Sequence, residues 1–589
     1  MRRFLPYVVA LIAAVLLAVF EQDLLYRLQE QGLFLHTPLF FEQRMVCAGG
    51  LLTWVGAYLT QFFYYPPLGA GMLCLLWMFL MWLLKRAFRL EGYWLTLVPV
   101  ACLLLTITDL GYWVYYLKLP GHAFVATVGT IMAVALLWIY RNVSRKAYLS
   151  TVFIVAAGCV GYPLFGFYGL LAVVLMAIVS WRADGHRLAD SLVAVLTVIA
   201  VPLLCYHFVY HETNIVNIYW AALPVYGMRG ETFFAYNLPY IVIVASLCLM
   251  TLPFAGNRWL QVGAVTGAVA CVAVFWYKDE NFHSELSMTR SCEQQDWDKV
   301  LETAKRVKGE PTRAICMMKN LALSRLRRQG DEMFHYPEGA KRPNAPFPIR
   351  MVQTVGKRLY LEYGVLNYCY RWCMEDGVEY GWSVEKLKLM ALCSLMNGEI
   401  EALHRYLNML KKTDFHKSWA KRCEAYLYRP QEMKYDAELM AIRDMMRDDD
   451  FLTADMAQME QFLLEHFTTA QSRMPLLQEQ ILIAAMQTKD MKLFWRQFYQ
   501  YTEMHRDSEK MPVHFQEAAC LFGHLNNIDV SHMPFDRQVV ENYQGFAGTV
   551  GEYQRKGMTI DQIRPLVYDR YHHTYYYDFY FNRYNYVEN

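Results

Sequence analysis

The sequence predicts an all-α chain, in which a bundle of about nine transmembrane helices is followed by a soluble α-solenoid domain. Residues 1–276 form a series of apolar runs, each long enough to cross a bilayer core of about 30 Å. Residues 277–589 contain no such run, and apolar residues recur there at three and four steps, as in amphipathic helices. A net charge of only +2 gives no indication of a nucleic-acid partner.

The first span is residues 4–20. Its two arginines and apolar stretch resemble a secretory signal, but no small-residue cleavage site precedes the sequence EQD and further spans follow, so we expect it to be retained. The remaining predicted spans are 67–84, 92–109, 122–140, 148–163, 166–181, 188–208, 238–254 and 258–276.

The apolar segment 45–63 decides the topology. Cytoplasmic loops of membrane proteins carry an excess of Lys and Arg. If the segment does not cross the membrane, this excess lies on the inner side, and if the segment crosses, the excess lies on the outer side. The sequence therefore predicts a cytoplasmic N-terminus, a long outer loop at 21–66 with helices along the membrane surface, and an outer domain at 277–589. In a bacterium this is an inner-membrane protein with a periplasmic C-terminal domain.

Residues 277–589 are predicted to form a series of helical hairpins. Three helices are expected near 384–397, 400–412 and 416–428, and another hairpin at 475–504. The offset between successive first helices, roughly 32 residues, is close to the ~34 of tetratricopeptide repeats, so each hairpin would bury its apolar stripe against its neighbours. The tyrosine-rich tail after residue 567 is expected to form a capping helix.

Two carboxylates, Glu21 and Asp23, directly follow the first span in the stretch VFEQDLL. Charged side chains are inexpensive at a membrane interface, so these two residues could simply solvate a helix end. Alternatively, a carboxylate at a partly desolvated mouth suits a general base.

The outer loop 209–237 carries the other candidates for a site. It contains His211, Glu212, Arg229 and Glu231, which together could bind an anionic headgroup or a phosphate across a cavity from Glu21 and Asp23. An ordinary polar loop is the alternative. The sequence contains no phosphate-binding loop, dinucleotide fingerprint or zinc-protease motif.

The layout resembles the GT-C superfamily of membrane glycosyltransferases. The matching pieces are the first span running outward, the ExD at Glu21-Gln22-Asp23, the long outer loop 21–66, and the PPLG at 66–69 before a span that returns to a basic loop. The same span pattern, with the stretch NLALSRLRRQGDEMFHYP, also resembles an uncharacterised family of bacterial multi-span membrane proteins with a periplasmic tetratricopeptide-like domain.

The first resemblance implies transfer of a sugar from a polyprenyl-phosphate donor at the periplasmic face. Asp23 would be the general base or a ligand of a divalent cation, Glu21 its partner, and Arg229 a contact for the phosphate. Two alternatives stay open: a non-catalytic, membrane-anchored scaffold whose helical repeats recruit envelope proteins, and a transporter.

Overall fold

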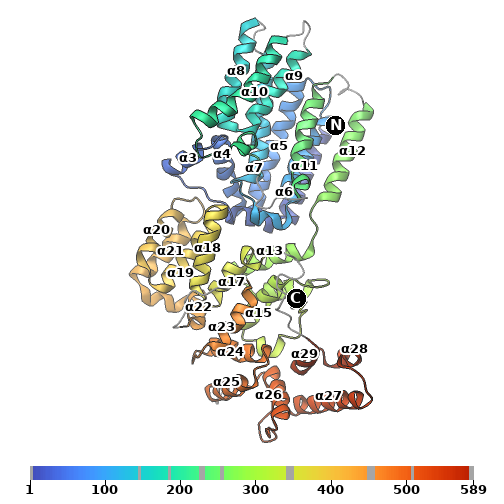
Figure 1. The fold of residues 1–589 in the computed structure, drawn as a ribbon, viewed down its shortest axis with the longest axis vertical. Coiled ribbons are helices and arrows are strands. Elements are labelled where there is room, and N and C mark those ends of the chain that lie inside the picture. The colour runs from blue at the N-terminus through green and yellow to red at the C-terminus, as the bar shows by residue number, and fades with distance from the viewer. Residues whose placement is uncertain are drawn as a thin grey trace. The chain divides into compact units, whose positions relative to one another are not determined.

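The computed structural model describes residues 4–142, 147–182, 188–224, 232–252, 258–339, 350–447, 458–505 and 510–582. Within these ranges the chain is helical and contains no strand, which confirms the predicted all-α class. The chain divides into two compact units (Figure 1). The first unit comprises Met1–Asp279, Asp376–Lys388 and Arg405–Cys423, and the second comprises Glu280–Glu375, Leu389–His404 and Glu424–Asn589.

Residues before 280 form twelve α-helices within the described ranges, joined by short 3-10 turns. The α-helices are α1 (Leu5–Phe20), α2 (Gln22–Glu30), α3 (Pro38–Met45), α4 (Gly50–Thr60), α5 (Pro66–Phe88), α6 (Leu97–Thr108), α7 (His122–Asn142), α8 (Ala147–Phe165), α9 (Phe167–Trp181), α10 (Leu188–Phe208), α11 (Thr232–Met250) and α12 (Arg258–Phe275); the turns are η1 (Gln61–Tyr64), η2 (Trp94–Thr96), η3 (Gly111–Tyr116) and η4 (Ile215–Trp220).

Packing in the first unit runs through two groups of helices (Figure 1). In one group α5 lies against α1 and α7, α7 also packs on α4 and α9, and α8, α9 and α10 pack on one another; in the other, α6 lies against α11 and α12. Close backbone approach makes the contact between α4 and α7 possible. Gly121 has a φ of +70°, and a Cβ placed there would lie 2.2 Å from the backbone nitrogen of Ala57, so a side chain would force the two helices apart.

The prediction of about nine transmembrane spans is wrong by the measure of helix length. In the described residues, three helices are long and apolar enough to cross a membrane, or up to five if each of two bent helix pairs is one span. The other apolar helices have 10–17 residues, and at about 1.5 Å per residue they rise less than a bilayer core of about 30 Å. The full-length helices are α5, α7 and α10; the bent pairs begin with α1 and with Gln261–Phe275 of α12; the shorter helices are Trp94–Thr108, Leu149–Phe165, Phe167–Trp181 and Asn237–Met250.

The segment 45–63 forms α4 and the turn η1. With 11 residues, α4 rises only about 16 Å, which is too short for a crossing on its own. In contrast, α10 carries a row of exposed large apolar side chains, which is typical of a helix that faces lipid. That row includes Leu192, Val195, Leu196, Ile199 and Leu203.

Helices in the later part of the chain pack mainly against neighbours in the sequence, such as α13 with α14, α24 with α25 and α27 with α28. Their bounds are α13 (Glu280–Glu293), α14 (Trp297–Arg306), α15 (Arg313–Arg325), α16 (Gln329–Glu332), α17 (Gly356–Glu362), α18 (Leu366–Tyr380), α19 (Val384–Asn397), α20 (Ile400–Leu410), α21 (Lys417–Tyr428), α22 (Ala437–Met445), α23 (Met459–Thr469), α24 (Pro475–Gln487), α25 (Met491–Met504), α26 (Val513–Asn526), α27 (Arg537–Arg555), α28 (Ile560–Tyr571) and α29 (Tyr575–Phe581).

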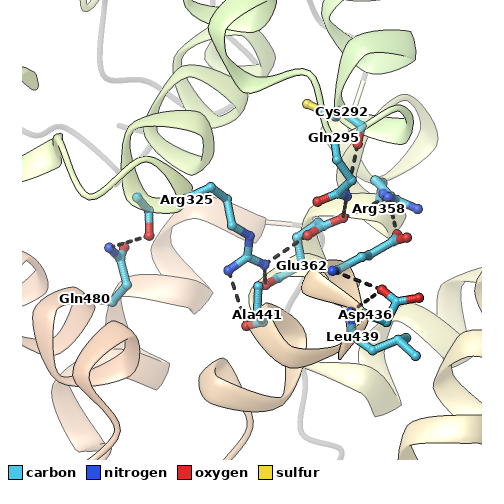
Figure 2. A network of polar contacts seen from close by, with 11 residues as sticks. Cys292, Gln295, Arg325, Arg358, Glu362, Asp436, Leu439, Ala441 and Gln480 are labelled. Atoms are coloured by element: carbon cyan, nitrogen blue, oxygen red, sulfur yellow. Dashed lines mark hydrogen bonds and ion pairs between the residues drawn. The ribbon is translucent and has the colours of Figure 1, made fainter. Parts of the chain in front are cut away.

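A buried charge network lies in the core of the second unit (Figure 2). Glu362, which is fully buried, pairs with Arg325 and Arg358 at 2.9 Å each, and Arg358 also contacts Glu438 at 2.6 Å. The two positive charges of the arginines are thus balanced by the two negative charges of the glutamates. Breaking a buried ion pair of this kind is strongly destabilising, and we therefore assign these residues a structural role.

Candidate functional site

Glu21 lies at the bend between α1 and α2. The apolar sequence of α1 ends at Phe20, and the more polar sequence QDLLYRLQE then forms α2 at an angle of 75°. Glu21 joins both helices: its backbone N–H donates to the carbonyl of Leu17, and its carbonyl accepts from the N–H of Leu25. The side chain of Glu21 is buried, with 2% of its surface exposed.

The C-terminal end of α12 meets this bend. Trp276 donates a hydrogen bond from its indole Nε1 to Oε1 of Glu21 at 2.6 Å. The N–H of the next residue, Tyr277, donates to the carbonyl of Thr108 at 3.0 Å and so ties the end of α12 to the end of α6. Gly111 has a φ of +50°, and a Cβ there would lie 2.6 Å from the ring of Tyr277, so the absence of a side chain makes room for this contact.

An apolar cavity of about 220 Å³ lies between α6, α11 and α12. Asp109, which follows the last residue of α6, is the one charged residue among the described lining residues, and the others are apolar or carry a thiol. Phe275 lines the cavity, and the next residue in the chain, Trp276, binds Glu21. The α12 wall consists of Ala264, Gly267, Ala268, Cys271 and Phe275.

Asp23 lies in the first turn of α2 and is half-buried. A carboxylate in a first helical turn is stabilised by the partial positive charge of the unsatisfied backbone N–H groups, which accounts for its presence there in structural terms. The same position leaves Asp23 two residues from Glu21 and at the end of α2 that lies nearest to α1. This placement is compatible with both roles considered for Asp23, that of a helix-end charge and that of a base.

The candidates of the loop 209–237 lie in a different setting. His211 and Glu212 are exposed, and the hydroxyl of the following Thr213 lies 3.9 Å from the sulfur of Cys47. The next residues pack on α8 and α9: Tyr162 donates from its hydroxyl to the carbonyl of Ile218, and the N–H of Phe167 donates to the carbonyl of Ala221. Arg229 and Glu231 lie outside the described residues.

Buried ionic contacts between α2 and a later segment of the chain were not predicted from the sequence. Arg27 donates to Glu385 at 2.6 Å, and Lys388 contacts Glu30 at 3.0 Å. Both contacts join residues of the first unit that lie far apart along the chain. Charged residues at the polar positions of an amphipathic helix normally face water, so their burial could not be predicted from the amino-acid pattern.

His416 completes this cluster. It is buried, accepts a hydrogen bond of 2.7 Å at Nε2 from the side-chain amide nitrogen of Gln29, and lies 3.8 Å from Glu30. Burial, with a smaller contribution from the charge of Lys388, lowers the pKa of His416 to about 2. His416 is therefore neutral at physiological pH, and the charges of Glu30 and Lys388 compensate each other. The described residues contain no group of three His, Cys, Asp or Glu side chains placed to hold a metal ion.

The comparisons with known proteins identify a family and give no activity. The model of a family of unknown function, DUF6057, matches residues 1–582. No curated protein matches the chain, and no solved structure matches it.

Proposed function

The chain belongs to the DUF6057 family, and we propose that it is a membrane enzyme that transfers a sugar from a polyprenyl-phosphate donor to an acceptor. One observation carries the proposal: an apolar cavity between α6, α11 and α12 is lined by Phe275, and the next residue, Trp276, binds the buried carboxylate of Glu21. An isoprenoid tail needs an apolar groove that opens among membrane helices, and the chemistry at its head needs a carboxylate close by.

In this proposal the cavity receives part of the polyprenyl chain. Its wall of Ala264, Gly267 and Ala268 on α12 presents small side chains, which leaves room for a flexible hydrocarbon. A site that buries apolar ligand surface and adds a few placed polar groups is the usual form of a small-molecule site. The sugar phosphate would then lie beyond the apolar wall, at the bend between α1 and α2.

Asp23 would act as the general base. It would accept the proton of an acceptor hydroxyl while that oxygen forms a bond to the anomeric carbon of the sugar. The bond from this carbon to the phosphate oxygen would break, and polyprenyl phosphate would leave with the electron pair. Glu21, whose carboxylate is held by Trp276, would fix the bend that presents Asp23 and would act as a positioning residue.

The finer architecture belongs to the same proposal. The three to five described helices or bent helix pairs that are long and apolar enough would cross the membrane, and α4 would lie along the outer interface. The N-terminus would then be cytoplasmic and residues 277–589 periplasmic, as the distribution of Lys and Arg indicates.

The consecutive helix pairs of residues 277–589 would form a tetratricopeptide-like solenoid. Arg229, with His211, Glu212 and Glu231, would contact the phosphate or the acceptor.

Replacing Asp23 with Asn tests the catalytic assignment. Asn keeps the shape and the hydrogen-bonding capacity but cannot accept the proton, and loss of a general base costs on the order of 10²–10⁴ in rate. In a strain that depends on this gene, Asp23→Asn is expected to abolish the phenotype at an unchanged level of protein. Asp298→Asn, which changes an exposed first-turn carboxylate in α14, is the matched control and should complement normally.

The double variant Glu21→Gln with Asp23→Asn gives the decisive outcome. Normal complementation by this variant would contradict a catalytic role for the ExD stretch and would leave the scaffold as the function. In that case the helical-repeat part, and not the membrane site, would carry the activity of the protein.

A further inference from the structure

A second cavity lies in the second unit, between the segment 471–473 that precedes α24 and the helix α25. It is an open polar groove of about 720 Å³, which is within the range of roughly 300–1,000 Å³ typical of small-molecule sites. Among its lining residues only Met504 is apolar. The others are Gln471, Ser472, Arg473, Arg496, Gln497, Gln500 and Glu503.

The groove presents positive charge that no carboxylate neutralises by direct pairing. Arg473 comes from the segment before α24 and Arg496 from α25; both are exposed, and neither forms an ion pair or a hydrogen bond with the part of the chain that the structure describes. Glu503 supplies one negative charge to the lining, so the balance is positive. A guanidinium group presents a planar fork of donors that matches a carboxylate or a phosphate.

A buried amide in the groove wall lacks a partner. Gln497 is 2% exposed, yet its side-chain Oε1 accepts no hydrogen bond from the described residues. Its surroundings are otherwise fixed: Gln478 donates to the backbone carbonyl of Gln497 at 2.8 Å, and Gln500 donates to the carbonyl of Ser472 at 2.7 Å. Buried polar atoms are usually paired with protein, water or a ligand, so Oε1 of Gln497 has the capacity to accept a hydrogen bond from a molecule in the groove.

We propose that this groove binds a sugar chain that carries an anionic group. The two arginines would hold a carboxylate or a phosphate of the sugar. A hydroxyl of the sugar would donate to the Gln497 amide after rotation about its last side-chain torsion, which is a broad, soft rotor. The polar lining favours a glycan over an acidic peptide, because peptide recognition depends on apolar anchors in pockets and this groove offers only Met504.

Titration of the full-length chain tests the proposal. The protein is held in a detergent without a sugar headgroup and titrated in a calorimeter with four probes: tetragalacturonate, maltotetraose 1-phosphate, neutral maltotetraose and tetraglutamate. At least one of the two anionic sugars is expected to bind saturably and at least tenfold more tightly than maltotetraose. Tighter binding of tetragalacturonate would identify the anionic group as a carboxylate, and tighter binding of maltotetraose 1-phosphate would identify it as a phosphate.

Variants link any binding to the groove. Arg473→Gln with Arg496→Gln alters only exposed side chains and should weaken binding at least tenfold, and Gln497→Leu should weaken it through loss of the amide. Lys492→Gln, which changes an exposed charge of α25 outside the lining, is the matched control and should bind normally. Absence of saturable binding by both anionic sugars, equal binding in the arginine variant, or tighter binding of tetraglutamate through the same residues would overturn the proposal.

Discussion

Glu21 in the first unit and Glu362 in the second are both buried carboxylates, but their partners differ. Glu362 lies between Arg325 and Arg358, in a network whose charges balance within the core (Figure 2). Glu21 accepts a hydrogen bond from the neutral indole of Trp276, and the preceding residue, Phe275, lines an apolar cavity. The comparison shows that burial of a charge does not by itself indicate a functional site. The groups around the charge, and the space next to it, separate a structural carboxylate from a candidate site.

The largest expected effect on stability is at Glu362, the structural carboxylate of this pair. Glu362→Gln would leave two buried guanidinium groups with less compensation, and breaking a buried pair costs about 3–5 kcal/mol. The free energy of unfolding, measured by denaturant titration of the full chain, should fall by about that amount. Glu302→Gln is the control, because Glu302 forms an exposed pair with Arg306 and should contribute less than about 1 kcal/mol.

Glu21→Gln should lose less stability than Glu362→Gln, because the amide oxygen of Gln still accepts the hydrogen bond of Trp276. An equal loss in both variants would remove the distinction between the two carboxylates.

A smaller effect is expected from His416, which lies in the first unit with its pKa lowered to about 2 by burial. The unfolded chain binds a proton at this residue below a pH of about 6.5, whereas the folded chain does not, so stability falls as the pH falls. Between pH 6.5 and pH 5 the loss attributable to His416 should be about 2 kcal/mol. Denaturant titrations at the two pH values should show this loss, and His416→Gln should reduce it. An unchanged pH dependence in the variant would show that a group other than His416 causes the loss of stability.

The smallest effect concerns two buried tyrosines of the first unit. The hydroxyl of Tyr162 donates to the carbonyl of Ile218 at 2.7 Å, whereas the buried hydroxyl of Tyr168 has no hydrogen-bond partner among the described residues. Tyr162→Phe should destabilise the protein by about 1 kcal/mol, and Tyr168→Phe should be neutral or stabilising. A comparison of the melting temperatures of the two variants checks the difference, and an equal shift would contradict it.

The amino-acid sequence predicted the helical elements well for a physical reason. Apolar runs and amphipathic spacing are local signals, and the expected helices at 384–397 and 475–504 correspond closely to α19 and to the pair α24 and α25. Helix length was predicted less well. A hydropathy pattern does not show where the α-helical backbone begins, as in the predicted span 92–109, where the turn η2 comes first and α6 begins only at Leu97.

The candidate site was only partly predictable. The position of Glu21 and Asp23 after the first span drew attention to them, but Trp276 lies at the far end of the membrane part of the sequence, and only the fold brings it to Glu21. The same holds for Glu385, Lys388 and His416, which contact α2 from the later part of the chain. Contacts between distant segments leave no periodic signal in one sequence, so these residues could not have been identified from it.

The most direct test of the proposed function is the binding of radiolabelled polyprenyl phosphate to the full-length protein. Gly267 and Gly263 lie one turn apart on α12, and a Cβ at either would meet open space, but only Gly267 lines the cavity. Gly267→Leu should therefore fill the cavity and weaken binding at least tenfold, while Gly263→Leu should bind like the unaltered chain. Equal binding by the two variants, or no saturable binding by the unaltered chain, would contradict the assignment of this cavity to a polyprenyl tail.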